Sequence, residues 1–190
     1  MLQMVNVLID ASGLERAAKS IADIPGAVKK AEKYALSRAG DVVRTVAVRE
    51  TTARYYVKGT DLRKKITLKK TTEQVQMIVR GKRHTLAAYK ISPMRKPKRG
   101  KYNLRGAAKR REPIEDLGPR AFLMPITGKH PFIPMRRKGQ ARLPIEAVRG
   151  PAYPEIVSEG ETLTPIQQEA LEAWEKEFKR QAMRALGVLA

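Results

Sequence analysis

A single helical period runs without interruption through Gly26-Ala-Val-Lys-Lys-Ala-Glu-Lys-Tyr-Ala-Leu-Ser-Arg-Ala-Gly-Asp-Val-Val-Arg-Thr-Val-Ala-Val-Arg-Glu-Thr51. Its apolar residues are spaced by three and four, as on one face of an α-helix, and they are Val28, Ala31, Ala35, Ala39, Val42 and Val46. Small side chains on that stripe allow another element to pack closely against it. The sequence therefore predicts one long helix from Gly26 to about Thr51.

The residues before this helix predict a strand and a second, shorter helix. Val5, Val7 and Ile9 alternate with other residues, as in a strand with one buried face. Ser12-Gly-Leu-Glu15 is typical of a capping box that opens a helix, and Pro25 ends it. The apolar start falls short of the roughly 20 residues of a membrane span and lacks a basic flank, so neither a signal peptide nor a transmembrane helix is expected.

After the long helix the period changes from that of a helix to that of strands. Residues 66–68 and 75–79 alternate between apolar and polar side chains and predict a hairpin, and Leu86 to Ile91 is a plausible third strand. Three later runs, residues 120–126, 132–136 and 142–148, are apolar but broken by prolines. Since proline cannot donate to a ladder, we expect these runs at sheet edges, strand starts or bulges.

The chain closes with an amphipathic helix. Thr164-Pro-Ile-Gln167 combines a capping residue, a proline and a capping-box glutamine, and the apolar positions that follow include Trp174 and Phe178. These two aromatic residues favour core packing over a docking ridge for a partner. The expected fold class is α+β, with a long N-terminal helix pair packed on an antiparallel β-sheet, a basic loop inserted between strands and a C-terminal amphipathic helix. We expect a domain over residues 1–157 and a helical extension over residues 158–190.

The strongest functional signal is charge. Between Gln74 and Arg111 the chain has thirteen Lys or Arg residues and no acid, within a formal net charge of +20. Prolines and glycines interrupt residues 92–111, which predicts a long mobile loop that contacts a polyanion and does not read bases. The polyanion is a nucleic acid, contacted through its phosphates, or an acidic surface of a neighbouring protein. The predicted DNA-binding residues are Lys82, Arg83, Arg95, Lys96, Lys98, Arg99, Lys101, Arg105, Lys109, Arg110 and Arg111.

Residues suited to catalysis or metal binding are scarce. The chain has no cysteine, which excludes disulfides and thiolate metal sites, and its two histidines, His84 and His130, do not form a ligand pair. It lacks the nucleophile-elbow, phosphate-loop and dinucleotide fingerprints. Acids at 112, 115 and 116 could hold Mg²⁺ in a nuclease, but compensation of the adjacent cations is the simpler interpretation. We therefore expect no enzyme, no cofactor and no metal.

Three short motifs in the second half resemble a known family. They are Ala121-Phe-Leu-Met-Pro-Ile-Thr-Gly128, Phe132-Ile133 with Arg136-Arg137, and Leu143-Pro-Ile-Glu-Ala-Val-Arg-Gly-Pro151. In this order they are similar to the C-terminal signature of the minor tail protein Z family of long-tailed bacteriophages and prophages. Tyr55-Tyr-Val-Lys-Gly-Thr-Asp-Leu-Arg63 also resembles a segment of that family. The resemblance covers roughly residues 1–157.

The resemblance implies a structural virion protein that completes the head-proximal end of a tail. Its partners would be tail terminator or tail tube proteins, head–neck connector proteins, the phage DNA end and further copies of itself in a ring, by tail geometry a hexamer, with no membrane. Assembly would take place in the host cytoplasm. Candidate subunit contacts are Phe122, Phe132, Pro144, Ile145 and Pro151. A stand-alone, non-sequence-specific nucleic-acid-binding protein is the alternative class, since it explains the charge equally well.

Overall fold

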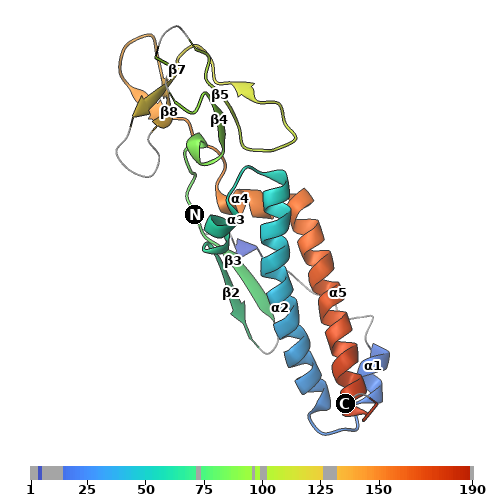
Figure 1. Ribbon diagram of the computed structural model, residues 1–190. Coiled ribbons are helices and arrows are strands. Elements are labelled where there is room, and N and C mark those ends of the chain that lie inside the picture. The colour runs from blue at the N-terminus through green and yellow to red at the C-terminus, as the bar shows by residue number, and fades with distance from the viewer. Residues whose placement is uncertain are drawn as a thin grey trace.

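The computed structural model describes residues 4–5, 15–71, 74–95, 97–98, 102–125 and 132–188. Two parts follow one another along an elongated molecule (Figure 1). We call the first the helical body, which is formed by the helices α1–α5 and the sheet of β1–β3. The second is the distal module, residues 81–150, which carries the strands β4–β9.

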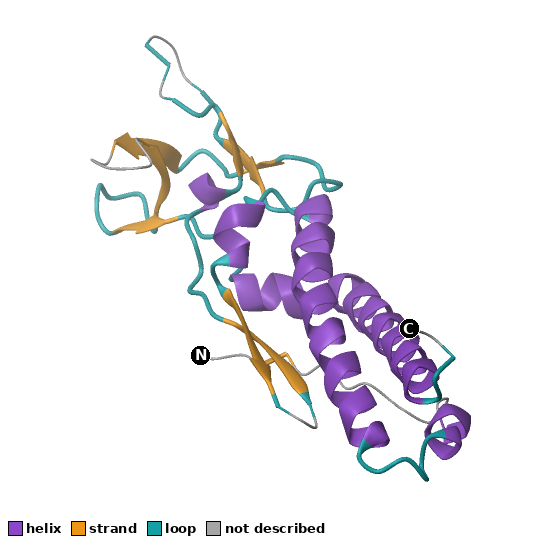
Figure 2. Ribbon diagram, turned by 60° about the horizontal axis from the view of Figure 1, so that its bottom comes forward, coloured by secondary structure: helices purple, strands orange, loops and turns teal. Residues whose placement is uncertain are grey.

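Two long helices lie side by side and form the spine of the helical body (Figures 1 and 2). They are α2, Ala27–Arg54, and α5, Gly160–Ala185. The alanine stripe of α2 is buried, as its period predicts, and it shares a core cluster with Trp174 and Phe178 of α5. These two rings pack with centroids 5.6 Å apart, which confirms them as core residues.

The α+β class expected from the sequence is therefore confirmed, and the structure shows which helices form the long pair. The helix before α2 is α1, Glu15–Ser20, which has only six residues and contacts the end of α5. The long partner of α2 comes instead from the C-terminus. It begins at Gly160, four residues before the start predicted at Thr164, because the amides of Thr162 and Leu163 already donate to the Glu159 carbonyl at 2.9 and 2.8 Å.

A three-stranded antiparallel sheet covers α2 on the side away from α5 (Figures 1 and 2). Its strands are β1, Met4–Val5, β2, Ile66–Lys70, and β3, Val75–Val79, in the order β1-β3-β2. The predicted hairpin is confirmed, with Leu68 opposite Met77. The remainder of the strand predicted up to Ile9, and the capping box at Ser12, lie outside the described residues.

One core joins the sheet, the long helices and two short ones. These are α3, Gly59–Arg63, and α4, Tyr153–Ser158. Leu62 of α3, Ile156 of α4 and Ile166 of α5 belong to one buried cluster. The boundary predicted after residue 157 thus falls inside α4, one residue before its end, and α4 and α5 contribute to the same core. A division into separate folding units there stays a prediction.

The distal module contains two small antiparallel sheets. One has β4, Lys90–Ser92, β5, Arg105–Ala107, and β6, Glu115–Asp116. The other has β7, Ala121–Pro125, β8, Phe132–Arg137, and β9, Ile145–Ala147. A third buried cluster, formed by Leu86, Ile91, Leu104 and Leu123, holds them together.

The distal module departs from the sequence-based expectations at three places. Residues 86–88 form a short 3₁₀ helix, so the predicted third strand is confined to β4. The predicted loop 92–111 contains β5, because Leu104 is fully buried and anchors this strand in the module core. Pro134 lies in β8, the central strand of its sheet, where its carbonyl accepts from the Val148 amide at 2.9 Å.

Backbone hydrogen bonds tie the distal module to the end of α2. The Tyr56 amide donates to the Ala108 carbonyl at 2.8 Å, and the Arg110 amide donates to the Arg54 carbonyl at 2.7 Å. On the other side, the Tyr89 hydroxyl donates to the Pro151 carbonyl at 2.5 Å. The module is thus attached both to the end of α2 and to the segment that leads into α4.

Candidate nucleic-acid interface

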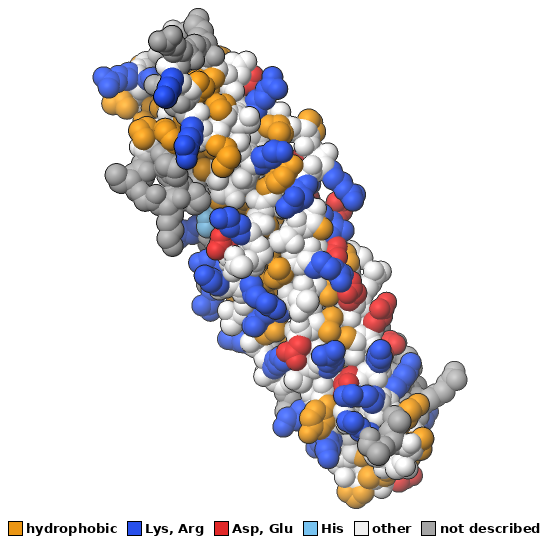
Figure 3. Space-filling view, in the orientation of Figure 1, with side chains coloured by type: hydrophobic (Ala, Val, Ile, Leu, Met, Phe, Trp, Pro, Cys, Tyr) orange, Lys and Arg blue, Asp and Glu red, His pale blue; other side chains and the backbone are white. Residues whose placement is uncertain are grey.

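The distal module carries most of the net positive charge of the chain. Residues 81–150 contain nineteen Lys or Arg and four Asp or Glu, whereas residues 151–190 contain four and seven. The module has few buried positions, so its cations lie at the surface, and blue side chains are visible over this upper end in Figure 3. An anion that approaches the molecule therefore meets its strongest attraction at this end.

Five of the predicted DNA-binding residues are exposed and unpaired. Within the described part of the chain none of them has a carboxylate within 4.0 Å, and they are Lys82, Arg95, Lys98, Arg105 and Arg111. Arg95 and Lys98 lie on the connection between β4 and β5, and Arg105 lies on β5 itself. Arg95 and Lys98 thus present charge without local neutralisation, whereas Arg105 lies opposite Asp116 in the ladder but forms no ion pair with it. Cations without an ion pair suit phosphate contacts.

Three other predicted residues have partners inside the protein. Arg83 pairs with Glu155 at 3.1 Å. Lys109 pairs with Glu159 at 2.7 Å, and the Arg110 guanidinium donates to the Thr52 carbonyl at 2.8 Å. These contacts join the module to the helical body, so a role of the three side chains in DNA binding stays a prediction.

Lys109 lies in a polar cluster with Glu159 and Tyr55. Glu159 accepts from both Lys109 and the Tyr55 hydroxyl. The hydrogen bonds from Lys109 and Tyr55 lower the pKa of Glu159, and the carboxylate in turn raises the pKa of Lys109. Burial and the Glu159 hydrogen bond raise the pKa of Tyr55, which therefore stays a neutral donor. Both charges of the pair persist at neutral pH.

The remaining predicted residues, Lys96, Arg99 and Lys101, lie outside the described residues. They belong to the same connection between β4 and β5 as Arg95 and Lys98. Their contribution to the surface therefore rests on the sequence alone.

A second basic segment adds to this surface, and the sequence-based prediction did not include it. No acid occurs between Leu117 and Ile145, and the described cations of this run are Arg120, Arg136, Arg137, Lys138 and Arg142. Lys129 belongs to the same run but lies outside the described residues. Arg137 lies over the Phe122 ring, 5.2 Å from its centroid, and donates to the Arg142 carbonyl at 2.6 Å. The feature of the sequence that indicates this segment is again the absence of Asp and Glu over a long stretch. It is harder to recognise than the first run because apolar strand residues separate its cations.

The predicted subunit contacts lie mainly in or beside the sheet of β7–β9. Phe122, Phe132 and Ile145 are half-buried, and Pro144 is exposed after a cis peptide bond. Leu143 beside it has an exposed fraction of 66%. Pro151 is engaged within the protein through its carbonyl, which binds Tyr89. Participation of these residues in a subunit interface stays a prediction.

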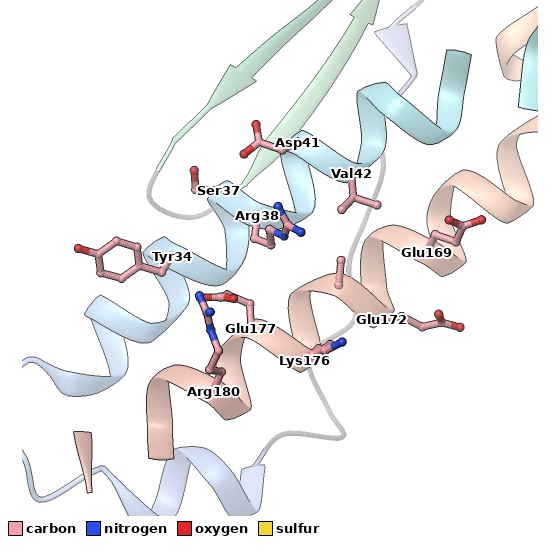
Figure 4. Close-up of a pocket in the computed structure, with 11 residues that line it drawn as sticks. Tyr34, Ser37, Arg38, Asp41, Val42, Glu169, Glu172, Lys176, Glu177 and Arg180 are labelled. Carbon is pink, nitrogen blue, oxygen red and sulfur yellow. The ribbon is translucent and has the colours of Figure 1, made fainter. Parts of the chain in front are cut away.

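A groove of about 770 Å³ lies between α2 and α5 (Figure 4). Its walls carry both charge signs, and three of its carboxylates are already paired. Asp41 binds Lys70 at 2.7 Å, Glu177 binds Arg180 at 2.7 Å, and Glu169 binds Arg49. Among the described residues, no three His, Asp or Glu side chains form a group suited to a metal ion.

The acids that the sequence offered for Mg²⁺ are divided between different contacts. Glu112 pairs with Lys109 at 3.4 Å, which supports charge compensation. Asp116 accepts from the Gly118 amide at 2.8 Å in the turn after β6. Within the described ranges, no helix has the length and hydrophobicity needed to span a membrane.

Comparison with known proteins gives one match. The sequence profile of the family described as prophage minor tail protein Z (GPZ) matches residues 11–189, nearly the whole chain. No curated protein and no solved structure matches this chain. The match extends beyond the predicted extent of the resemblance and includes the C-terminal helix α5.

Proposed function

Because this chain belongs to the prophage minor tail protein Z family and is thereby a structural protein of a phage tail, we propose that it completes the head-proximal end of that tail. In this position it joins the tail to the head–neck connector. Further copies form a ring, by tail geometry a hexamer, around the lumen through which DNA leaves the head. The contribution of the chain is structural and requires no catalysis.

The observation that carries the proposal is the uneven distribution of charge. The distal module holds nineteen cations and four acids at one end of an elongated molecule, and its unpaired Arg95, Lys98 and Arg105 lie on one hairpin. In a ring, this density is multiplied by the number of copies and faces the end of the DNA. The helical body then supplies the contacts with tail terminator or tail tube proteins.

The interaction with DNA is a phosphate interaction. The unpaired cations project from a hairpin connection and a short strand, and no long helix of the described chain lies in the distal module to enter a major groove. Such contacts hold any sequence equally well, which suits a protein that retains whichever DNA end is packaged. Binding is therefore expected to be strongly salt-dependent.

The role in the tail is tested by electron microscopy of lysates from a phage or prophage in which this reading frame is deleted. We expect free heads beside tails, or joined particles that fail to deliver DNA, and rescue by the gene supplied in trans. Normal infectious particles from the deletion strain would overturn the proposal and favour the stand-alone nucleic-acid-binding protein.

The DNA contact is tested by the salt dependence of duplex binding. The variant R95Q/K98Q/R105Q/R111Q removes four unpaired cations of the distal module, and the slope of log K against log salt should fall by about 0.9 for each phosphate that the variant no longer neutralises. The matched control is K29Q/K33Q/K179Q/R184Q, which removes four exposed cations from the helical body. Equal slopes for the two variants would remove the distal module from the mechanism.

A further inference from the structure

Five unpaired cations form a ridge on the sheet side of the helical body. They lie on α3, on β2 and on the residues that flank α3, and we call Lys58, Arg63, Lys64, Lys65 and Lys69 the basic ridge. All five are exposed, and within the described ranges none has a carboxylate within 4.0 Å. Asp61 is the one acid of the sequence between Thr51 and Thr72.

The opposite charge gathers on the first part of α5 and its N-cap, ahead of Lys179, Arg180 and Arg184. Residues 159–177 contain six Glu and one Lys, in a chain whose net charge is +20. Glu159, Glu169 and Glu177 are paired within the protein. The other three have no ion-pair partner in the described part, and we call Glu161, Glu172 and Glu175 the acidic face.

The two surfaces point in opposite directions. The sheet of β1–β3 and α5 lie on opposite sides of α2 in both ribbon views (Figures 1 and 2). In the space-filling view, most of the visible acidic side chains follow the α5 edge, where basic side chains lie among them, whereas the opposite edge is mainly basic (Figure 3). Complementary patches on opposite sides of one molecule allow a head-to-tail contact between identical copies, and such contacts close into a ring when the rotation permits.

Ordinary helix and strand effects explain only part of this arrangement. The helix dipole favours an acid in the first turn, which accounts for Glu161, but its influence does not extend to Glu172 and Glu175 in the middle of α5. Lysine on an edge strand blocks unwanted pairing, which accounts for Lys69 on β2. That role does not apply to Lys58 and Arg63, which lie outside the strand.

We propose that the acidic face of one copy binds the basic ridge of the next copy and forms the lateral contact of the ring. This inference rests on the proposed function, since it assumes several copies at the end of the tail. It assigns the ring contact to the helical body and leaves the cations of the distal module free for DNA. The occupant of the basic ridge is thus a second copy of this chain.

The test is a charge exchange in the deletion strain. The variant E161K/E172K/E175K makes both surfaces basic, and K64E/K65E/K69E makes both acidic. Each variant alone should lower the titre of infectious particles by about 100-fold, because like charges then face each other at every repeated contact. Co-expression of the two should restore the titre, since copies that alternate around an even-numbered ring again pair opposite charges.

Each outcome decides the matter. Full titre from either variant alone, or no recovery on co-expression, overturns the proposal. A loss confined to the ridge variant means that the ridge binds another anion, DNA included, and also overturns it. Far-ultraviolet circular dichroism and thermal unfolding verify that both variants fold. If one does not, the milder pair E172Q/E175Q and K64Q/K65Q replaces it, with the fraction of assembled protein at low and high salt as the readout.

Failure of this proposal is distinguishable from failure of the proposed function. The acidic-face variant leaves every cation of the distal module in place, so the salt slope of its duplex binding should equal that of the natural chain. Deletion of the reading frame should still yield defective particles whichever surface forms the ring.

Discussion

Neighbouring cations of the same type do different work in this protein. Arg110 and Arg111 are adjacent and both exposed, yet only Arg110 donates to the Thr52 and Tyr55 carbonyls and lies 4.9 Å from the Tyr56 ring centroid. Arg110 satisfies carbonyls near the end of α2 that have no helical donors. Because backbone carbonyls engage the guanidinium of Arg110, Arg111 is the better placed of the two to bind an external anion.

The pKa shift of Glu159 predicts a pH-dependent contribution to stability. Its pKa lies below the ordinary value of 4.5, so its contribution is complete above that pH and is lost as the pH falls through the folded-state pKa. Glu159→Gln should therefore cost about 1 kcal/mol at pH 7 and less at pH 3.5. Urea unfolding at the two pH values measures the difference.

The control for this variant is Glu172→Gln, which removes an exposed carboxylate of the same helix that has no ion pair in the described part of the chain. Its unfolding free energy should match that of the natural chain at pH 7. An equal loss for Glu159→Gln at both pH values would show that the ion pair with Lys109 does not carry the effect.

At the scale of elements, the alanine stripe of α2 determines how closely α5 approaches. Ala31, Ala35 and Ala39 are at most 1% exposed and share a cluster with two aromatic side chains of α5. The aromatic rings supply the bulk and the alanines leave the space for it. A stripe of larger side chains on α2 would hold the two helices apart.

Ala35→Leu should destabilise the fold by about 1–3 kcal/mol, because the added carbons have no space between α2 and α5. The same change at Ala53, an exposed position of α2, should alter the unfolding free energy by less than about 0.5 kcal/mol. Guanidinium unfolding of the two variants gives the comparison. Equal effects would mean that the helix interface repacks without strain.

At the scale of the whole molecule, α5 contributes to two of the buried clusters that form the hydrophobic core. Ile166 and Ala170 belong to one buried cluster and Trp174 and Phe178 to another. The family match likewise extends to residue 189. The helical extension expected from the sequence therefore packs against α2 on the side opposite to the sheet of β1–β3.

A chain that ends at Ser158 should lose cooperative unfolding, because removal of α5 exposes the alanine stripe and the two clusters it shares. Thermal unfolding monitored by circular dichroism measures this, and binding of a hydrophobic dye reports the exposed core. A cooperative transition in the shortened chain would instead support an independent domain over residues 1–157.

Local pattern sufficed for much of this protein. The period of residues 26–51 predicted α2, the alternation of residues 66–79 predicted the hairpin, and the order of three motifs indicated the family. Helical and strand periods are properties of a few consecutive residues, so they survive without knowledge of the fold. Net charge and the acid-free run between Gln74 and Arg111 are likewise properties of composition.

Local sequence pattern could not predict which side chains and elements contact one another in the folded chain. Several features depend on contacts between residues far apart in the sequence. These are the packing of α5 on α2 and the burial of Leu104, which places β5 inside the expected loop. Such contacts also engage Lys109 and Arg110 while Arg95 and Lys98 stay without an ion pair. The fold determines which carboxylate or carbonyl binds a given cation, and it determines which element packs against a given apolar face. These contacts exist only in the folded chain, whereas the periods and the charge are already present in the unfolded one.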